Sequence, residues 1–560
     1  MQFLTVASAL FTGAAATIST NTMSCMCFPG DTCWPSEVDW AGLNATVGGR
    51  LIATVPLGSP CHDPTYNATE CAYLQSQWLY SGIHMNSSSS VMAPFFANQS
   101  CDPWQPTSRP CSLGNYVRYS VNATGPDDII AAVNFAREKN VRFVVRNTGH
   151  DYHGRSTGAG ALSVWTHHLK NIEILSWNDT SYSGPAFKFG AGIQGFEALA
   201  AATDLGHVVV TGECPTVGIA GGYTQGGGHS GLSTKYGLAA DNTLSFDVVT
   251  SSGDLVVASR SENTDLYWAL SGGGVGYGVV VSITVKAHPE ATVSGAKFSL
   301  QLSDNGNSTA KLYQAIDLFH ESLPDIVQDG NMVIYFFTNT FLQIPALTSY
   351  NQTQAQLEAT LSPLLTKLDG LRYNYTVTYT EYPTYYEHYD HYWGPLPDGN
   401  IQVGVAQFGG RLIEHQHLSN FSSTARAIAE EGVIFIGVGT DVGSFGGDNA
   451  VLPAWRNTIV QASLELSWNF TAPWSEGLAA QEKITDVVGP IIEAATPGSG
   501  TYMNEADWRQ PDFQNVFYGS NYDKLLSIKN DWDPTNMFYS VIAVGSEAYT
   551  VQEDGRLCKA

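Results

Sequence analysis

Residues 212–242 read GECPTVGIAGGYTQGGGHSGLSTKYGLAADN, and their glycines are too dense to be explained by core packing alone. Glycine lets a backbone lie against a flat or anionic ligand where a Cβ would clash. Further glycine-rich loops read GAGIQG at 190–195 and SGGGVGYGVV at 271–280. A ligand that contacts three separate glycine loops must be long, and a dinucleotide cofactor has that length.

Three shorter motifs suggest other chemistries, and we reject each of these interpretations. Residues 190–195 fit the G-x-G-x-x-G fingerprint, but the acidic residue expected about 20 positions later would be Glu213, which lies in another glycine-rich loop. Residues 154–158 (GRSTG) fit a nucleophile elbow, yet an elbow must follow a strand directly and the apolar strand ends at Val145. Residues 387–391 (EHYDH) lack the H-E-x-x-H pattern, so a tyrosine-rich surface is the better interpretation and no metal is expected.

The composition indicates an acidic glycoprotein. The formal net charge of −25 repels phosphate backbones and anionic lipid, so we expect no nucleic-acid partner and no membrane partner. Only 14% of the residues are charged, and attached sugar would keep such a surface wet. Eleven N-x-S/T sequons support this interpretation: Asn44, Asn67, Asn86, Asn98, Asn122, Asn178, Asn307, Asn351, Asn374, Asn420 and Asn469.

The N-terminus and the cysteines indicate export to an oxidising compartment. An apolar run from Phe3 to Ala16 ends in small residues, which predicts a signal peptide over residues 1–19. Eight cysteines lie near the two chain ends and can pair, with the connectivity left open: Cys25, Cys27, Cys33, Cys61, Cys71, Cys101, Cys111 and Cys558. The isolated Cys214 is left over. We therefore expect a secreted, extracellular monomer.

The rest of the chain divides into segments that differ in composition and predicted secondary structure. Residues 20–115 are rich in cysteine and proline, which predicts an irregular cap. From Pro126 to about Pro289, helices and strands alternate as in an α+β or α/β lobe. Between about 290 and 500, aromatic strands alternate with helical stretches, which indicates a sheet covered on one face. The last ordered piece, Val516–Ser540, contains a helix that ends at Asp533-Pro534.

Four motifs in this order resemble one known family. They are VRNTGHDY at 145–152, GECPTVG at 212–218, GGGVGYGVV at 272–280, and YGSNYDKLL at 518–526 with DPTN at 533–536. Together they resemble the berberine-bridge-enzyme-like branch of the vanillyl-alcohol-oxidase superfamily, and the wording Asn-Thr-Gly-His is similar to that of the secreted fungal members. The resemblance covers roughly residues 115–545.

This resemblance implies an α+β fold of two lobes. An FAD-binding domain at 116–290 would consist of two α+β subdomains. A substrate domain at 291–500 would hold an antiparallel sheet backed by helices. Residues 501–560 would return to the FAD-binding domain, and the cap would occupy residues 20–115.

The resemblance also implies bicovalent FAD, attached through His150 to the 8α-methyl group and through Cys214 to C6. The alternatives are a structural thiol at Cys214, a singly attached or hydrogen-bonded His150, and attachment at His153. The full set of residues expected to bind the cofactor is His150, Cys214, Asn147, Thr148, Gly149, Asp151, Gly154, Ser156, Gly212, Val217, Gly218, Gly221, Gly222, Gly228, Val279 and Asn521.

The implied activity is that of an oxidase with a small-molecule substrate and O2 as its partners. Hydride would pass from an alcohol, sugar or secondary-metabolite carbon to flavin N5, and O2 would then be reduced to H2O2. Two alternatives stay open: a dehydrogenase of the same fold with another acceptor, and a catalytically retired protein that keeps its flavin.

Three residues are candidates for catalysis by this resemblance. Glu414 follows the pair Gly409-Gly410 at the spacing of the plant members' catalytic glutamate, and hydride transfer from an alcohol needs a nearby base. Tyr518 and Tyr522 of the terminal motif would orient the substrate. Glu414 as a solvated strand-end carboxylate is the alternative. A tyrosine-rich run at 379–393 would either line the cleft or cover the sheet.

Overall fold

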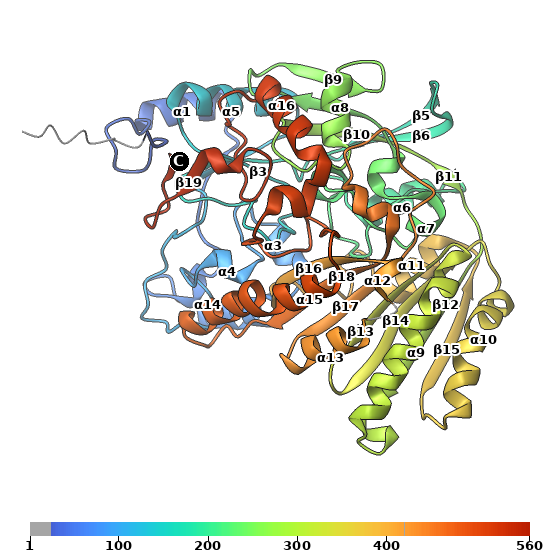
Figure 1. The fold of residues 1–560 in the computed structure, drawn as a ribbon. Helices are drawn as coiled ribbons and strands as arrows, with labels where there is room; N and C mark the ends of the chain where they lie inside the picture. The colour runs from blue at the N-terminus through green and yellow to red at the C-terminus, as the bar shows by residue number, and fades with distance from the viewer. Residues whose placement is uncertain (1–23, 419–420) are drawn as a thin grey trace, which may run out of the picture.

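The protein, seen in a computed structural model, is described over residues 24–418 and 421–560. The expected signal peptide at 1–19 and the sequon at Asn420 lie outside the described residues. The chain forms two lobes, with the C-terminal segment packed back on the first lobe (Figure 1).

The first lobe contains two sheets that differ in strand direction. The smaller has the order β1-β2-β4-β3, and both β2 and β3 run parallel to β4. The larger is antiparallel throughout, with the order β5-β6-β10-β8-β9. The bounds are β1 Leu51–Ala53, β2 Tyr119–Asn122, β3 Phe143–Arg146, β4 Leu162–Trp165, β5 Ile172–Asn178, β6 Ser183–Gly190, β8 Thr243–Val249, β9 Leu255–Ser259 and β10 Val279–Lys286.

Helix α5 (Pro126–Lys139) shows why the small sheet forms. Proline at the first helical position has no N–H to satisfy, and Asn140 ends the helix in a left-handed conformation. The helix buries Ile129, Ala132 and Val133 in the same core as the strands. Strand β3 then leads into the loop 147–156.

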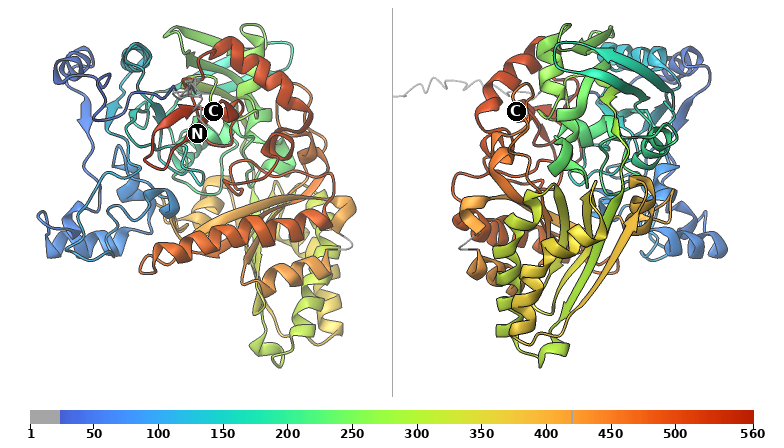
Figure 2. Two further views of the ribbon diagram at one scale, coloured as in Figure 1. Left: turned by 60° about the vertical axis from the view of Figure 1, so that its left-hand side comes forward. Right: turned by 90° about the vertical axis from the view of Figure 1, so that its right-hand side faces the viewer.

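The second lobe is one seven-stranded antiparallel sheet, ordered β15-β12-β14-β13-β17-β18-β16. Helices α9, α10, α13 and α15 pack on one face of it (Figures 1 and 2). The strands are β12 Val293–Gln301, β13 Asn331–Phe337, β14 Phe341–Tyr350, β15 Thr376–Tyr382, β16 Ala406–Glu414, β17 Ile434–Gly439 and β18 Thr458–Ser467, and the helices are α9 Thr309–Gln328, α10 Gln354–Gly370, α13 Ser422–Glu430 and α15 Gly489–Ala495. The predicted α+β class, with an antiparallel sheet backed by helices, is confirmed.

The C-terminal segment joins the first lobe through helix α16 (Tyr522–Trp532), which packs against α8 (Thr264–Leu270). The buried Lys529 on α16 donates hydrogen bonds to the carbonyl of Gly276 at 2.5 Å and to Asp533 at 2.6 Å. The chain therefore closes on the glycine-rich loop at 271–280.

Four disulfides use the eight terminal cysteines: Cys25–Cys558, Cys27–Cys33, Cys61–Cys71 and Cys101–Cys111. Cys214 is the remaining cysteine and is free, as the count predicted. Within the N-terminal region, β1 pairs with β2, so this region contributes a strand to the first lobe. Over the described ranges, no helix combines the length and apolar character that crossing a bilayer requires.

Candidate active site

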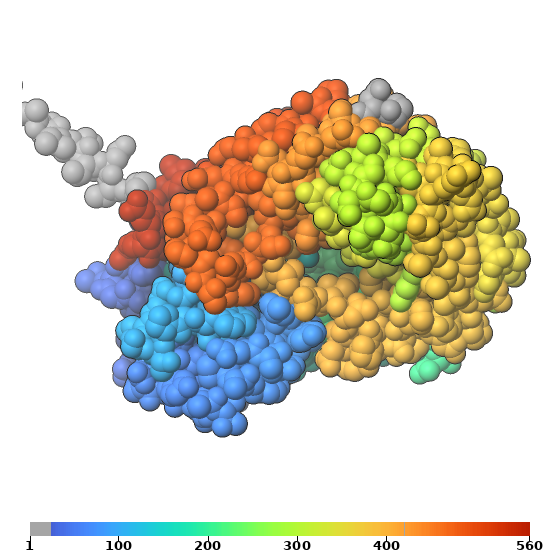
Figure 3. All heavy atoms as spheres, turned by 90° about the horizontal axis from the view of Figure 1, so that it is seen from below, coloured from blue at the N-terminus to red at the C-terminus, as the bar shows by residue number. Residues whose placement is uncertain are grey.

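A cavity of about 340 Å³ is lined by residues of both lobes. The loop after β3, the glycine stretch and residues 538–540 line it from the first lobe and the C-terminal segment. Residues 401–405, Phe408 and Glu465 line it from the second lobe. Viewed from below, the molecule is hollowed at its centre, where teal atoms of the first lobe show between orange and yellow segments (Figure 3).

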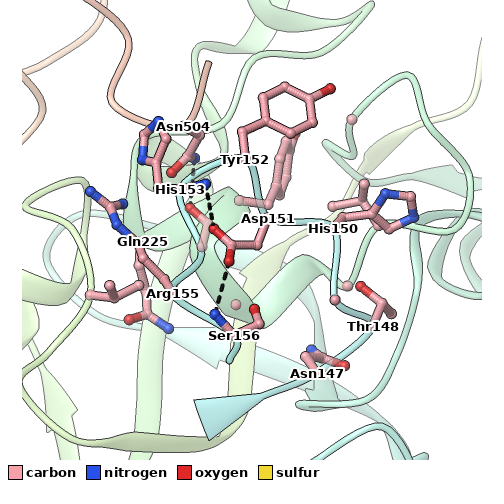
Figure 4. Close-up of a pocket in the computed structure, with 18 of the residues that line it drawn as sticks. Asn147, Thr148, His150, Asp151, Tyr152, His153, Arg155, Ser156, Gln225 and Asn504 are labelled. Carbon is pink, nitrogen blue, oxygen red and sulfur yellow. Dashed lines mark hydrogen bonds between the residues drawn. The ribbon is translucent and has the colours of Figure 1, made fainter. Parts of the chain in front are cut away.

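Hydrogen bonds and close packing against Arg146 fix the conformation of the loop at 147–156. The buried Arg146 donates hydrogen bonds to the carbonyls of His84 and Ser90. Gly149 adopts φ +87°, and a Cβ there would lie 2.6 Å from the Arg146 guanidinium. The carboxylate of Asp151 accepts hydrogen bonds from two backbone N–H groups of the loop, as the dashed lines in Figure 4 show. The loop is therefore fixed where it borders the cavity.

His150 and Cys214 contact the same hydroxyl group. The oxygen of Thr216 lies 2.8 Å from Nε2 of His150 and 3.4 Å from Sγ of Cys214. Burial lowers the pKa of His150 to about 3, so its imidazole is neutral and keeps a lone pair. Burial raises the pKa of the Cys214 thiol. In contrast, Nε2 of His153 donates to the carbonyl of Ala506 at 3.0 Å, so this nitrogen is already engaged.

The cavity wall fits the flat, phosphate-bearing cofactor that the sequence resemblance implies. A Cβ added at Gly221 would come no closer than 3.7 Å to a protein atom, and one at Gly222 no closer than 3.8 Å. Gly222 does not have a positive φ, so neither packing nor the sign of φ explains this second glycine. The side-chain oxygen of Asn147 is also buried in the wall without a partner among the described residues. A ligand resting on this backbone explains both features.

A variant tests this explanation. Gly222→Val should fold but bind FAD roughly 10- to 100-fold more weakly, because the added carbons overpack the cavity by about 1–3 kcal/mol. The measurement is the ratio of flavin to protein absorbance after purification with added FAD. Gly42→Val, where a Cβ meets no atom within 4 Å, is the control and should keep wild-type flavin content. Full flavin content in Gly222→Val would contradict the explanation.

Acidic side chains gather at the side of the cavity that faces the second lobe. Glu213 and Glu505 flank His229, and Glu465 lines the same cavity. Tyr152 stacks on Phe408 with ring centroids 3.8 Å apart and planes 2° apart. This side therefore combines carboxylates with a planar aromatic surface.

Most residues expected to bind the cofactor come together at this cavity. Twelve of the sixteen line it: Asn147, Thr148, Gly149, His150, Asp151, Ser156, Gly212, Cys214, Val217, Gly218, Gly221 and Gly222. The other four do not, because each has a packing role. A Cβ at Gly154 would meet the Phe96 ring at 2.4 Å, and Gly228 packs on Tyr223 and Ala239. Val279 is buried in β10, and Asn521 donates to the carbonyls of Ala450 and Val451.

The three residues expected to be catalytic lie away from the cavity, which corrects the sequence interpretation. Glu414 lies six residues beyond Phe408 on β16, about 20 Å along the strand, and accepts a hydrogen bond from Gln416. The buried Tyr518 donates to the carbonyl of Ile542. The hydroxyl of Tyr522 donates to Glu547 at 2.5 Å and accepts from the N–H of Gly545. Both tyrosines fasten the C-terminal segment.

The cluster formed by Glu213, His229, Glu465 and Glu505 was not identified from the sequence. His229 stands inside the run Gly226–Gly231, and a polar ring among glycines that border a ligand was a usable signal. Glu465 and Glu505 are single carboxylates in a strand and a turn, and nothing in the residues around them marks them. Only the folded chain brings them together.

Comparison with known proteins places the chain in a family. The FAD binding domain model matches residues 117–259, and the berberine and berberine-like model matches residues 501–544. The chain is 53% identical over 547 residues to the FAD-linked oxidoreductase ZEB1 of Gibberella zeae, covering 97% of this chain and 96% of that protein. It belongs to the berberine-bridge-enzyme-like FAD-linked oxidoreductases.

Solved structures agree with this assignment. The VAO-type flavoprotein MtVAO615 from Myceliophthora thermophila superposes with a TM-score of 0.92 at 40% identity, covering 96% of this chain and all of that one. The glucooligosaccharide oxidase from Acremonium strictum shares the fold, with a TM-score of 0.64 at 18% identity over 77% of this chain and 92% of that one. This oxidoreductase builds one edge of its cavity from the berberine-like segment, which supplies Tyr502, Asn504, Glu505 and residues 538–540.

Proposed function

We propose that this protein is a secreted oxidase that carries FAD bound to both His150 and Cys214 and oxidises the carbon of a neutral alcohol. His150 and Cys214 would hold the FAD, which would supply a two-electron acceptor for the hydride and a donor for O2, with H2O2 as the product. The observation that carries the proposal is the shared contact of His150 and Cys214 with the Thr216 hydroxyl. The flavin's 8α and C6 positions lie on one ring, so two linking side chains must come close together.

The charges around the cavity favour a neutral substrate over an anionic one. Four acidic side chains line it against two cations, Arg155 and His229; the acidic ones are Asp151, Glu213, Glu465 and Glu505. A carboxylate substrate would be repelled there. The stacked rings of Tyr152 and Phe408 offer a surface on which a planar or hydroxylated carbon skeleton packs.

Two features support secretion. The four disulfides need an oxidising compartment to persist. Of the sequon asparagines in the described chain, Asn67, Asn86, Asn98, Asn178, Asn307, Asn351, Asn374 and Asn469 are exposed, as glycan attachment requires.

Peroxide release tests the activity. Purified protein given a panel of neutral alcohols in air should produce H2O2, and carboxylate-bearing analogues of the best alcohol should react far more slowly. Turnover that appears only with an added dye would instead identify a dehydrogenase of the same fold. Flavin-loaded protein that turns over nothing with O2 or dye would identify a catalytically retired flavin-binding protein.

A further inference from the structure

Glu213, His229 and Glu505 form a continuous chain of ion pairs at the cavity. Nδ1 of His229 lies 3.1 Å from one oxygen of Glu213, and Nε2 lies 2.9 Å from Oε1 of Glu505. Both ring nitrogens therefore donate to carboxylates. These carboxylates outweigh the effect of burial and raise the pKa of His229 well above its usual range.

Of the two carboxylates, Glu505 is the one open to the cavity. Its side chain is 26% exposed, whereas those of Glu213 and His229 are each 9% exposed. Glu213 places both oxygens within 3.3 Å of Nδ1 of His229. Glu505 uses only Oε1 for His229, and its Oε2 makes no hydrogen bond within the described residues. One oxygen of the Glu505 carboxylate is thus left to accept a proton from a ligand.

The other titratable groups near Glu505 lack its combination of an anchored carboxylate and a free oxygen. Burial and the charge of Glu505 raise the pKa of Glu465 to about 7, which suits a base near neutral pH, but no hydrogen bond within the described residues holds its side chain in place. Burial and the same carboxylate raise the pKa of Tyr502, and this phenol stays neutral. Tyr152 faces the same space and keeps its proton because burial disfavours the phenolate.

The backbone fixes Glu505 in this place. A Cβ at Gly410 would lie 2.1 Å from the carbonyl oxygen of Glu505, so only glycine on β16 lets this turn approach. The N–H of Glu505 closes the turn on the carbonyl of Tyr502 at 3.1 Å. The glycine pair that directed attention to Glu414 thus makes room for Glu505. At the other end of the chain of ion pairs, Glu213 directly precedes Cys214 in the sequence.

We propose that Glu505 is the catalytic base of this enzyme, taking the hydroxyl proton of the alcohol on Oε2, and that His229 and Glu213 are positioning residues that hold its carboxylate in place. The proposal rests on the alcohol oxidation proposed above. In the balanced step, the substrate O–H bond breaks and the proton bonds to Oε2 of Glu505. The oxygen lone pair forms the second C–O bond while the C–H hydrogen leaves with two electrons to the flavin.

The test compares the isosteric variant Glu505→Gln with the wild type. We expect kcat to fall roughly 10²- to 10⁴-fold, the usual contribution of a general base, with flavin content unchanged. The wild-type pH profile of kcat/KM should have an acidic limb, where protonation of Glu505 abolishes activity, and this limb should vanish in the variant. Glu173→Gln, on the exposed strand β5, is the control and should match the wild type.

A second measurement does not depend on turnover. In protein with ¹⁵N-labelled histidine, the imidazolium signal that His229→Gln removes should persist to alkaline pH in the wild type. It should titrate at lower pH in Glu505→Gln, because one of the two carboxylates is gone. Glu505→Asp keeps the charge, so it should retain the acidic limb with a reduced kcat, and it serves if Glu505→Gln does not fold.

Two results would overturn the proposal. One is a flavin-loaded Glu505→Gln enzyme with kcat within threefold of the wild type across the pH range. The other is an acidic limb that both Glu505 variants leave unchanged. If the wild type oxidises no alcohol with O2 or dye, the proposed function fails instead, and the NMR titration still decides whether His229 and Glu505 are coupled.

Discussion

Replacing Lys529 by methionine should destabilise the protein by about 3–5 kcal/mol, the usual cost of breaking a buried ion pair by removing one partner. The Lys529 ammonium and the Asp533 carboxylate are 2.6 Å apart, and both side chains are almost fully buried. Asp533 also accepts hydrogen bonds from the backbone N–H groups of Met537 and Phe538. In Lys529→Met the carboxylate would remain buried without its cation.

The measurement is the shift of the urea unfolding midpoint, followed by circular dichroism and by flavin absorbance. Because Phe538 lines the cavity, the flavin absorbance should change to that of a solvent-exposed flavin no later than the secondary structure is lost. Lys367→Met, on the exposed side of α10, should shift the midpoint little. The double variant Lys529→Met/Asp533→Asn should recover part of the loss, since it no longer buries an unpaired charge. Equal midpoints for Lys529→Met and Lys367→Met would show that this pair does not hold the segment.

The sequence predicted the parts of the site that depend on local backbone chemistry. The dense glycines at 218–222 line the cavity, and a polar loop follows the apolar strand that ends at Val145. Both features are visible in the sequence as short motifs. The free Cys214 followed from a count of cysteines, because the other eight pair.

The catalytic residues could not be predicted because they depend on how distant segments meet. Spacing from Gly409-Gly410 led to Glu414, but successive residues of a strand move steadily away from a site, and Glu414 is too far along β16. The same glycines instead admit Glu505, which is 95 positions away in the sequence from Gly410. Tyr518 and Tyr522 belong to a real motif whose role is to fasten the C-terminal segment. A motif identifies a family without showing which of its residues face the substrate.

Wild-type protein precipitated with acid should keep its flavin on the polypeptide, and the double variant His150→Ala/Cys214→Ala should release all of it as free FAD. Each single variant should stay yellow through the remaining bond. The reason is geometric and chemical. His150 presents a neutral imidazole, and Cys214 presents a thiol. The Thr216 hydroxyl contacts both side chains and can help to position the thiol proton.

Peptide mass spectrometry locates the bonds, since flavin mass should appear on peptides containing residues 150 and 214. His207→Gln, in the short strand β7 (His207–Val208) and not among the residues that line the cavity, is the control and should behave as the wild type. Flavin that leaves the wild type in acid would refute covalent attachment altogether. Flavin retained by the double variant would move the attachment elsewhere, and His153 is disfavoured because its Nε2 already donates to Ala506. Two bonds to one ring would also fix the flavin beside Glu213, the residue next to Cys214, and hence beside the ion pairs that end in Glu505.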